Sequence, residues 1–96
     1  MKRIKLEKVT VKQMTSNASG REIANQFIIY TPTGVYFQSY STIIACRIKG
    51  VTYLDKARWD CSVTTGKYRN QFTGDVGIAE TRRHIAEGTY KLANLN

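Results

Sequence analysis

The chain has 96 residues, 42% of them hydrophobic and 10% aromatic, which is enough for one core and too little for two. Fifteen Lys and Arg residues oppose seven Asp and Glu residues, so the formal charge at pH 7 is +8. The hydrophobic content excludes wholesale disorder, and the positive charge favours a polyanionic partner, either nucleic acid or an acidic protein surface. We expect residues 1–96 to form a single small globular domain.

The sequence also predicts the cellular compartment. Its longest apolar run, residues 27–30, is far shorter than the ~20 residues that cross a bilayer. The basic residues 1–5 are not followed by the apolar segment of a secretory signal. We therefore expect a cytoplasmic protein with no membrane partner, in which Cys46 and Cys61 are reduced thiols.

The N-terminal segment is basic and β-branched. Residues 4–13 are typical of an edge or surface strand, and residues 15–20 have the composition of a loop. Within the first twelve positions, five basic residues stand against one acidic residue. We interpret residues 1–21 as a basic strand and loop that can form a mobile arm of the domain.

The middle of the chain predicts four strands, at residues 22–30, 35–40, 42–48 and 51–54. Thr31-Pro32-Thr33-Gly34 predicts a turn between the first two, because proline presets φ at the second position of a turn. Lys49-Gly50 predicts a two-residue turn between the last two. Two antiparallel hairpins follow from this pattern, and Cys46 is expected to be a small core residue.

The C-terminal part predicts one helix. Periodicity is lost over residues 55–74, which we interpret as a long loop with a short helical turn. Residues 76–87 have helical periodicity, with Asp75 placed to cap the N-terminus and Gly88 suited to the position after the C-terminus. Residues 89–92 can add a last strand. The fold class expected is α+β: an antiparallel meander of four or five strands packed by one C-terminal helix.

The segment from Trp59 to Phe72 carries the clearest functional signal. After Gly66 comes the triplet Lys67-Tyr68-Arg69, whose cations can neutralise phosphates while the ring stacks on a base. A second interpretation is that the aromatic residues simply pin a loop into the core. The basic or aromatic residues that we expect to contact nucleic acid are Lys2, Arg3, Lys5, Arg47, Lys49, Lys67, Tyr68 and Arg69. Tyrosines of the sheet can equally reflect strand propensity alone.

No catalytic, cofactor or metal site is expected. A zinc site around the single histidine would need carboxylates, and no ligand-like spacing is evident. His84, with Glu80 one helical turn away, is interpreted as an exposed histidine that lacks a neighbouring nucleophile. Asp55 and Asp60 could hold a magnesium ion in a metal-dependent nuclease, which is the weakest alternative because the seven acidic residues are scattered.

Several short segments share an order with known sequences: residues 35–40, 43–45, 54–55, 59–60, 64–72, Glu80, Ile85 and residues 88–92. In this order they resemble a group of short, uncharacterised proteins encoded by tailed bacteriophages, over roughly residues 34–95. Cys61 stands where an aromatic residue is more usual in that group. The resemblance implies expression in a bacterial host and binding to host or phage machinery, and it supplies no catalytic residue.

These observations predict a non-catalytic phage-type accessory protein that binds DNA or RNA through a basic–aromatic surface. The alternative is a protein-binding inhibitor of a host enzyme or of an anti-phage defence complex. Exposed strands also make a homodimer by edge pairing possible.

Overall fold

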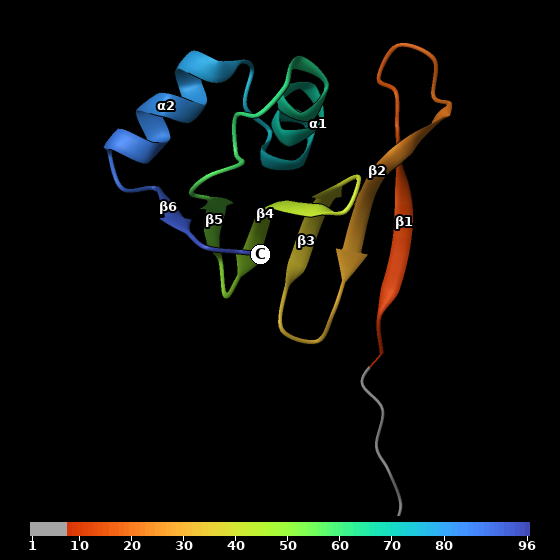
Figure 1. The fold of residues 1–96 in the computed structure, drawn as a ribbon, viewed down its shortest axis with the longest axis horizontal. Helices are drawn as coiled ribbons and strands as arrows, with labels where there is room; N and C mark the ends of the chain where they lie inside the picture. Colours follow the sequence, from red (N-terminus) through yellow and green to blue (C-terminus); the bar gives the residue numbers. More distant parts are fainter. Residues whose placement is uncertain (1–7) are drawn as a thin grey trace, which may run out of the picture.

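The computed structural model describes residues 8–96. Its elements in chain order are β1 (Thr10–Thr15), β2 (Glu22–Tyr30), β3 (Val35–Ser39), β4 (Thr42–Ile48), β5 (Val51–Asp55), α1 (Val63–Thr73), α2 (Ile78–Ala86) and β6 (Tyr90–Ala93) (Figure 1). The six strands form one sheet in sequence order. Neighbouring strands are antiparallel except β5 and β6, which are parallel. The α+β class is therefore confirmed, with six strands in place of the four or five expected and two helices in place of one.

Both predicted hairpins are confirmed. The Thr31 N–H donates to the Gly34 carbonyl over 2.9 Å and closes the β2–β3 turn. Lys49 and Gly50 have φ values of +51° and +78°, the left-handed pair that a two-residue β-turn of the I′ type requires. The N-terminal strand begins at Thr10 and pairs with β2, so this part of the predicted arm belongs to the sheet.

The expected loop over residues 55–74 is wrong in its second half, which forms α1. Ser62 caps this helix, because its hydroxyl accepts a hydrogen bond from the Thr65 N–H over 3.0 Å. Gly74, at φ +87°, ends the helix in the left-handed conformation. The apolar stripe of this helix is weak because its buried face contains the polar residues Thr65 and Arg69 beside Tyr68.

The predicted C-terminal helix is confirmed as α2, but its N-cap is Gly77 rather than Asp75. The Asp75 carboxylate instead accepts hydrogen bonds from two buried hydroxyl groups, so it does not cap the backbone N–H groups at the start of the helix. Gly88, at φ +80°, ends the helical segment as expected. The chain then enters β6 in the parallel direction, because α1 and α2 have carried it back across the sheet.

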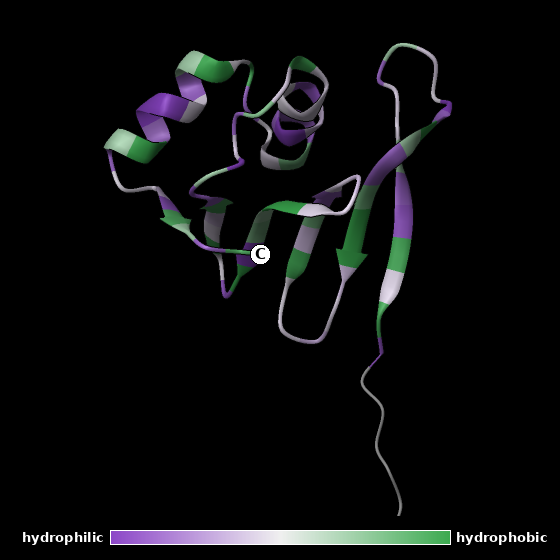
Figure 2. Ribbon diagram, in the orientation of Figure 1, coloured by the Kyte–Doolittle hydropathy of each residue, from purple (hydrophilic) through white to green (hydrophobic). Residues whose placement is uncertain are grey.

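One face of the sheet carries the core. Seven buried residues from the sheet and α1 form it: Met14, Phe37, Ile44, Ala45, Leu54, Tyr68 and Tyr90. Phe72 of α1 stacks on Phe37 with ring centroids 6.1 Å apart. Figure 2 shows hydrophobic stretches on β2 and β4 and a hydrophilic middle in α2. Side chains of both helices, Tyr68 of α1 and Ile85 of α2, pack in or against this core. We call this side of the sheet the helix face.

The opposite face of the sheet, the back face, has a different character. A row of directly paired residues crosses five strands on it: Val11, Ile29, Tyr36, Cys46 and Tyr53. Cys46 is buried, as expected, whereas the other four side chains are partly or largely exposed. Within residues 8–96 neither helix has the length and apolar character that a membrane crossing requires.

Candidate functional site

The basic–aromatic triplet does not form a surface site. Lys67 is exposed, but Tyr68 and Arg69 retain only 3% and 1% of their exposure. The Tyr68 ring belongs to the core, where no base can stack on it. The expectation that Tyr68 and Arg69 contact nucleic acid is therefore corrected, because Tyr68 packs in the core and Arg69 is buried against the loop before α1.

The buried Arg69 side chain connects α1 to the loop before it. Its guanidinium donates to the Trp59 carbonyl over 2.8 Å and to the Asn70 side chain over 3.0 Å, and it lies 5.3 Å from the Trp59 ring. Asp60 Oδ1 is 3.8 Å away. Burial lowers the pKa of Arg69, and the charge of Asp60 opposes that shift. The alternative interpretation, in which Trp59, Tyr68 and Phe72 pin this segment to the core, is confirmed.

The other predicted contact residues are separated in space. Lys49 is exposed in the β4–β5 turn, and Lys67 lines a cavity with Cys61 on α1 and the loop before it. Arg47 lies on the helix face of β4, where it lines a different hollow. Lys2, Arg3 and Lys5 lie outside the described residues. Within residues 8–96, Lys67 and Arg69 line the same cavity, but Arg47 and Lys49 do not join them in one cluster.

A groove that the sequence does not reveal lies between β1 and the end of α1. Its volume is about 360 Å³, and four of its lining residues are basic or aromatic: Lys12, Tyr30, Arg47 and Phe72. We call it the basic groove. Lys12 Nζ lies 5.9 Å from the centre of the Tyr30 ring, and Arg47 Cζ lies 4.9 Å from the centre of the Phe72 ring. Arg47 also donates to the Phe72 carbonyl over 3.1 Å. Each cation therefore lies beside an aromatic ring.

Sheet pairing explains how these residues meet. Tyr30 of β2 pairs with Val35 of β3, and Val35 pairs with Arg47 of β4, so all three side chains share the helix face. Lys12 follows on the edge strand, opposite Ile28. At the other wall, the Gln71 side chain donates to the Thr15 carbonyl over 3.1 Å and ties α1 to β1.

The basic residues of this groove lie apart from the acidic residues of the described part of the chain. Among residues 8–96, no acidic side chain lines it. The acidic residues of this part of the chain lie at the β1–β2 end of the sheet or near the helices and the end of β5: Glu22, Asp55, Asp60, Asp75, Glu80 and Glu87. Among the described residues, neither Lys12 nor Arg47 has a carboxylate within ion-pair distance.

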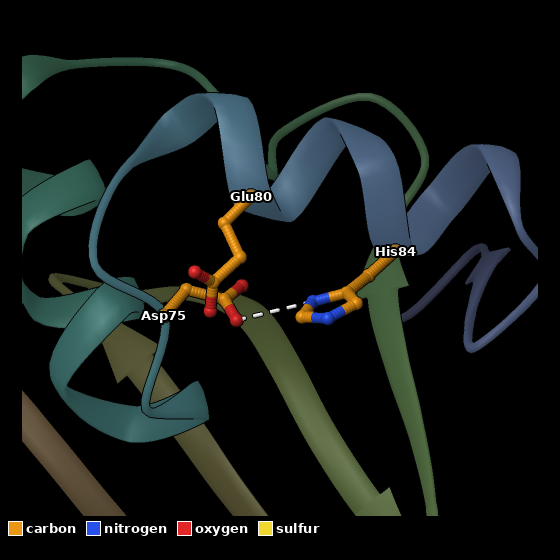
Figure 3. A group of neighbouring side chains, drawn as sticks. All are labelled: Asp75, Glu80 and His84. Carbon is orange, nitrogen blue, oxygen red and sulfur yellow. Dashed lines mark ion pairs between the residues drawn. The ribbon is translucent and has the colours of Figure 1, made fainter.

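A second cluster joins the loop before α2 to that helix. Asp75, Glu80 and His84 bring one ligand atom each to within 4.8 Å of one another. Figure 3 shows the two carboxylates side by side, with the imidazole pointing toward them. His84 is not the exposed histidine expected, because only 20% of its side chain is accessible and its Nδ1 lies 3.1 Å from Asp75 Oδ1. Helical spacing alone relates Glu80 to His84, and the sequence gives no sign that Asp75 joins them.

Asp75 is the centre of this cluster. Its carboxylate accepts hydrogen bonds from Thr81 Oγ1 over 2.7 Å and from the Tyr90 hydroxyl over 2.9 Å. Burial raises the pKa of Asp75, but these two hydrogen bonds and the charge of His84 outweigh it, so the pKa lies below its ordinary value. Burial and the bond to Asp75 together raise the pKa of Tyr90 to about 12.

The two aspartates considered for a magnesium site have separate roles. Asp55 is buried and accepts from the Leu95 N–H over 2.9 Å and from the Asn96 side chain over 3.1 Å. Burial raises its pKa, and these hydrogen bonds lower it to a net value below the ordinary one. Asp60 is 39% exposed and lies near Arg69 and Arg82. Asp55 therefore binds the C-terminal residues Leu95 and Asn96 through hydrogen bonds.

Comparison with known proteins gives a family but no activity. No curated protein and no solved structure matches the chain. A model of a family of unknown function (DUF8033) matches residues 9–88. The match runs from β1 through α2 and includes every residue of the basic groove and of the Asp75 cluster. The chain belongs to this family.

Proposed function

We propose that the protein is a small, non-catalytic accessory protein of bacteriophage type that binds nucleic acid in the host cytoplasm through the basic groove. The observation that carries the proposal is the pairing of each groove cation with an aromatic ring, Lys12 with Tyr30 and Arg47 with Phe72. Cations that follow a phosphate backbone and rings on which bases stack are the usual elements of single-strand binding.

Exposure of the groove supports this proposal. Tyr30 is 43% exposed, so part of its side chain is accessible to a base. Lys12 is exposed and lies on an edge strand, where a ligand can reach it without displacing a neighbour. Lys8, Lys49 and Lys67 are exposed outside the groove and can add phosphate contacts that carry no base preference.

The test is binding of the purified protein to labelled single- and double-stranded DNA and RNA over a salt series. For Lys12→Gln we expect weaker binding and a log–log salt slope smaller by about one, because one phosphate contact is lost. For Tyr30→Ala we expect roughly tenfold weaker binding of a single strand. Lys91→Gln, which removes an exposed charge from β6, is the matched control. Equal effects of Lys12→Gln and Lys91→Gln would refute the groove as the binding site.

A second candidate function rests on the back face of the sheet. Its paired row exposes Val11 to 57% and leaves Tyr36 and Tyr53 partly exposed. Apolar and aromatic side chains on an uncovered sheet face favour a protein partner, as an inhibitor of a host enzyme or defence complex would have. Pulldown from nuclease-treated host lysate tests it: a single retained protein that Val11→Glu releases would support this function, and retention of the same proteins by Val11→Glu would contradict it.

A further inference from the structure

We propose that Asp75, Glu80 and His84 form a binding site for a divalent transition-metal ion, for which Zn²⁺ is the probe. The three side chains offer two carboxylate oxygens and one imidazole nitrogen within 4.8 Å of one another. Mixed oxygen and nitrogen donors suit zinc and its neighbours in the first transition row, whereas magnesium and calcium prefer oxygen alone.

The separation of the donors fits a shared ion. Two ligands bound ~2.1 Å from one metal at 90–110° lie about 3.0–3.4 Å apart. His84 Nδ1 and Asp75 Oδ1 are 3.1 Å apart, within this interval. Glu80 is partly exposed on the first turn of α2, and its flexible side chain can shorten the remaining distances.

The imidazole nitrogen lacks a partner that would explain its position. Nδ1 of His84 is buried and makes no hydrogen bond of acceptable geometry to any of residues 8–96, despite its short distance from Asp75 Oδ1. A buried polar atom without a hydrogen bond costs about 1–3 kcal/mol. Coordination of a metal by this nitrogen would remove that cost, because the metal takes the lone pair that no donor uses.

The charge balance also favours a cation. Two carboxylates at this distance repel each other unless a proton or a cation lies between them. Among residues 8–96, His84 is at ion-pair distance from Asp75, and no Lys or Arg is at that distance from Asp75 or Glu80. A protonated imidazole balances one carboxylate charge, whereas a divalent ion balances both. The neighbouring arginines of α2 have other partners, since Arg82 lies 3.9 Å from Asp60 and Arg83 lies 3.2 Å from Glu87.

The surrounding structure holds the ligands in place. Glu80 and His84 are one helical turn apart and share a face of α2. Thr81 and Tyr90 fix the Asp75 carboxylate by hydrogen bonds, and the Tyr90 ring lies 4.7 Å from the imidazole. Outer hydrogen bonds of this kind orient metal ligands and are part of most metal sites. The partial exposure of Glu80 and His84 leaves room for water to complete the coordination.

The experiment measures Zn²⁺ binding to chelator-treated full-length protein by calorimetry and thermal unfolding. All variants carry Cys61→Ser, because the exposed Cys61 thiol could bind zinc independently. The site variants are Glu80→Gln and His84→Gln, and Glu87→Gln on the same helix is the matched control. Circular dichroism confirms that each variant folds, and the two site variants are independent in case one does not.

We expect one Zn²⁺ per chain and a midpoint of unfolding raised by roughly 10 °C at a hundredfold excess over Kd. Glu80→Gln and His84→Gln should each weaken binding at least roughly tenfold, while Glu87→Gln should leave it unchanged. Mg²⁺ should give no comparable shift. Absence of 1:1 binding, or equal affinity in the site variants and the control, would overturn the proposal. None of these outcomes depends on nucleic-acid binding.

Discussion

Because Tyr90 donates a hydrogen bond to Asp75, we expect the free energy of unfolding to fall as the pH becomes alkaline. The Tyr90 hydroxyl donates to Asp75 Oδ1 over 2.9 Å, and both residues are buried. Ionisation of the phenol would remove the donor and place a second negative charge beside the carboxylate. Burial and this bond therefore raise the pKa of Tyr90 from 10.0 to about 12.

The size and sign of the effect follow from linkage. Because the pKa of Tyr90 is higher in the folded state, its contribution to stability is complete below pH 10 and is lost as the pH rises to about 12. In this window the unfolded chain has released the proton that the folded protein retains. Each pH unit then costs about 1.4 kcal/mol, so the total loss is about 3 kcal/mol.

The assay is urea unfolding of the wild type and of Tyr90→Phe from pH 8 to pH 12. The two proteins differ only at residue 90, so the difference between the two curves isolates Tyr90. At pH 8, Tyr90→Phe should be about 1.5–3 kcal/mol less stable, because a buried carboxylate loses a donor. This difference should close by pH 12. A constant difference over the whole range would refute the reasoning, and Tyr40→Phe, at a position that is 63% exposed, serves as the control.

Two further predictions concern the core and a turn. The side-chain amide of Gln26 is fully buried and has no hydrogen-bond partner among the described residues. Gln26→Met should therefore raise the free energy of unfolding, measured by urea titration, by about 1–3 kcal/mol. A loss of stability in this variant would show that the amide is hydrogen-bonded. A Cβ at Gly34 would lie 2.6 Å from the Arg47 carbonyl oxygen, so Gly34→Ala should cost about 1–3 kcal/mol. Gly77→Ala, where no atom lies within 4 Å, should cost less than about 1 kcal/mol, and equal losses in these two alanine variants would contradict the steric explanation.

The sheet was predictable because its signals are local. Alternating apolar residues and short turn sequences define β2 to β5, and both turns lie where those sequences predict them. The direction of β6 was not predictable from its four residues. It depends on the path of α1 and α2, which return the chain to the same end of the sheet and so make the last pair parallel.

Helix α1 was missed because polar residues occupy its inward positions. Those positions have helical spacing and are Thr65, Tyr68, Arg69 and Phe72. A search for apolar periodicity finds only the two aromatic residues. The capping residues, Ser62 and Gly74, were the available signal, since hydroxyl and glycine at the two ends of an eleven-residue segment are typical of a helix.

The functional residues were predicted by type but not by position. A basic–aromatic pattern along the sequence selected Lys67, Tyr68 and Arg69, yet helical geometry turns two of them inward. The pairs Lys12–Tyr30 and Arg47–Phe72 come from different elements and are recognisable only once strand register is known. Charge composition therefore indicates a class of partner, while tertiary pairing decides which side chains can reach it.

The two candidate sites are joined by a short covalent path. Phe72, which bounds the basic groove, is followed by Thr73 and Gly74 and then by Asp75 of the proposed metal site. The Asp75 N–H donates to Thr73 Oγ1 over 3.2 Å, so the path is folded back on the end of α1. Arg47 holds the other end through its bond to the Phe72 carbonyl. Phe72 and Asp75, one from each proposed site, are thus held by contacts at the same end of α1.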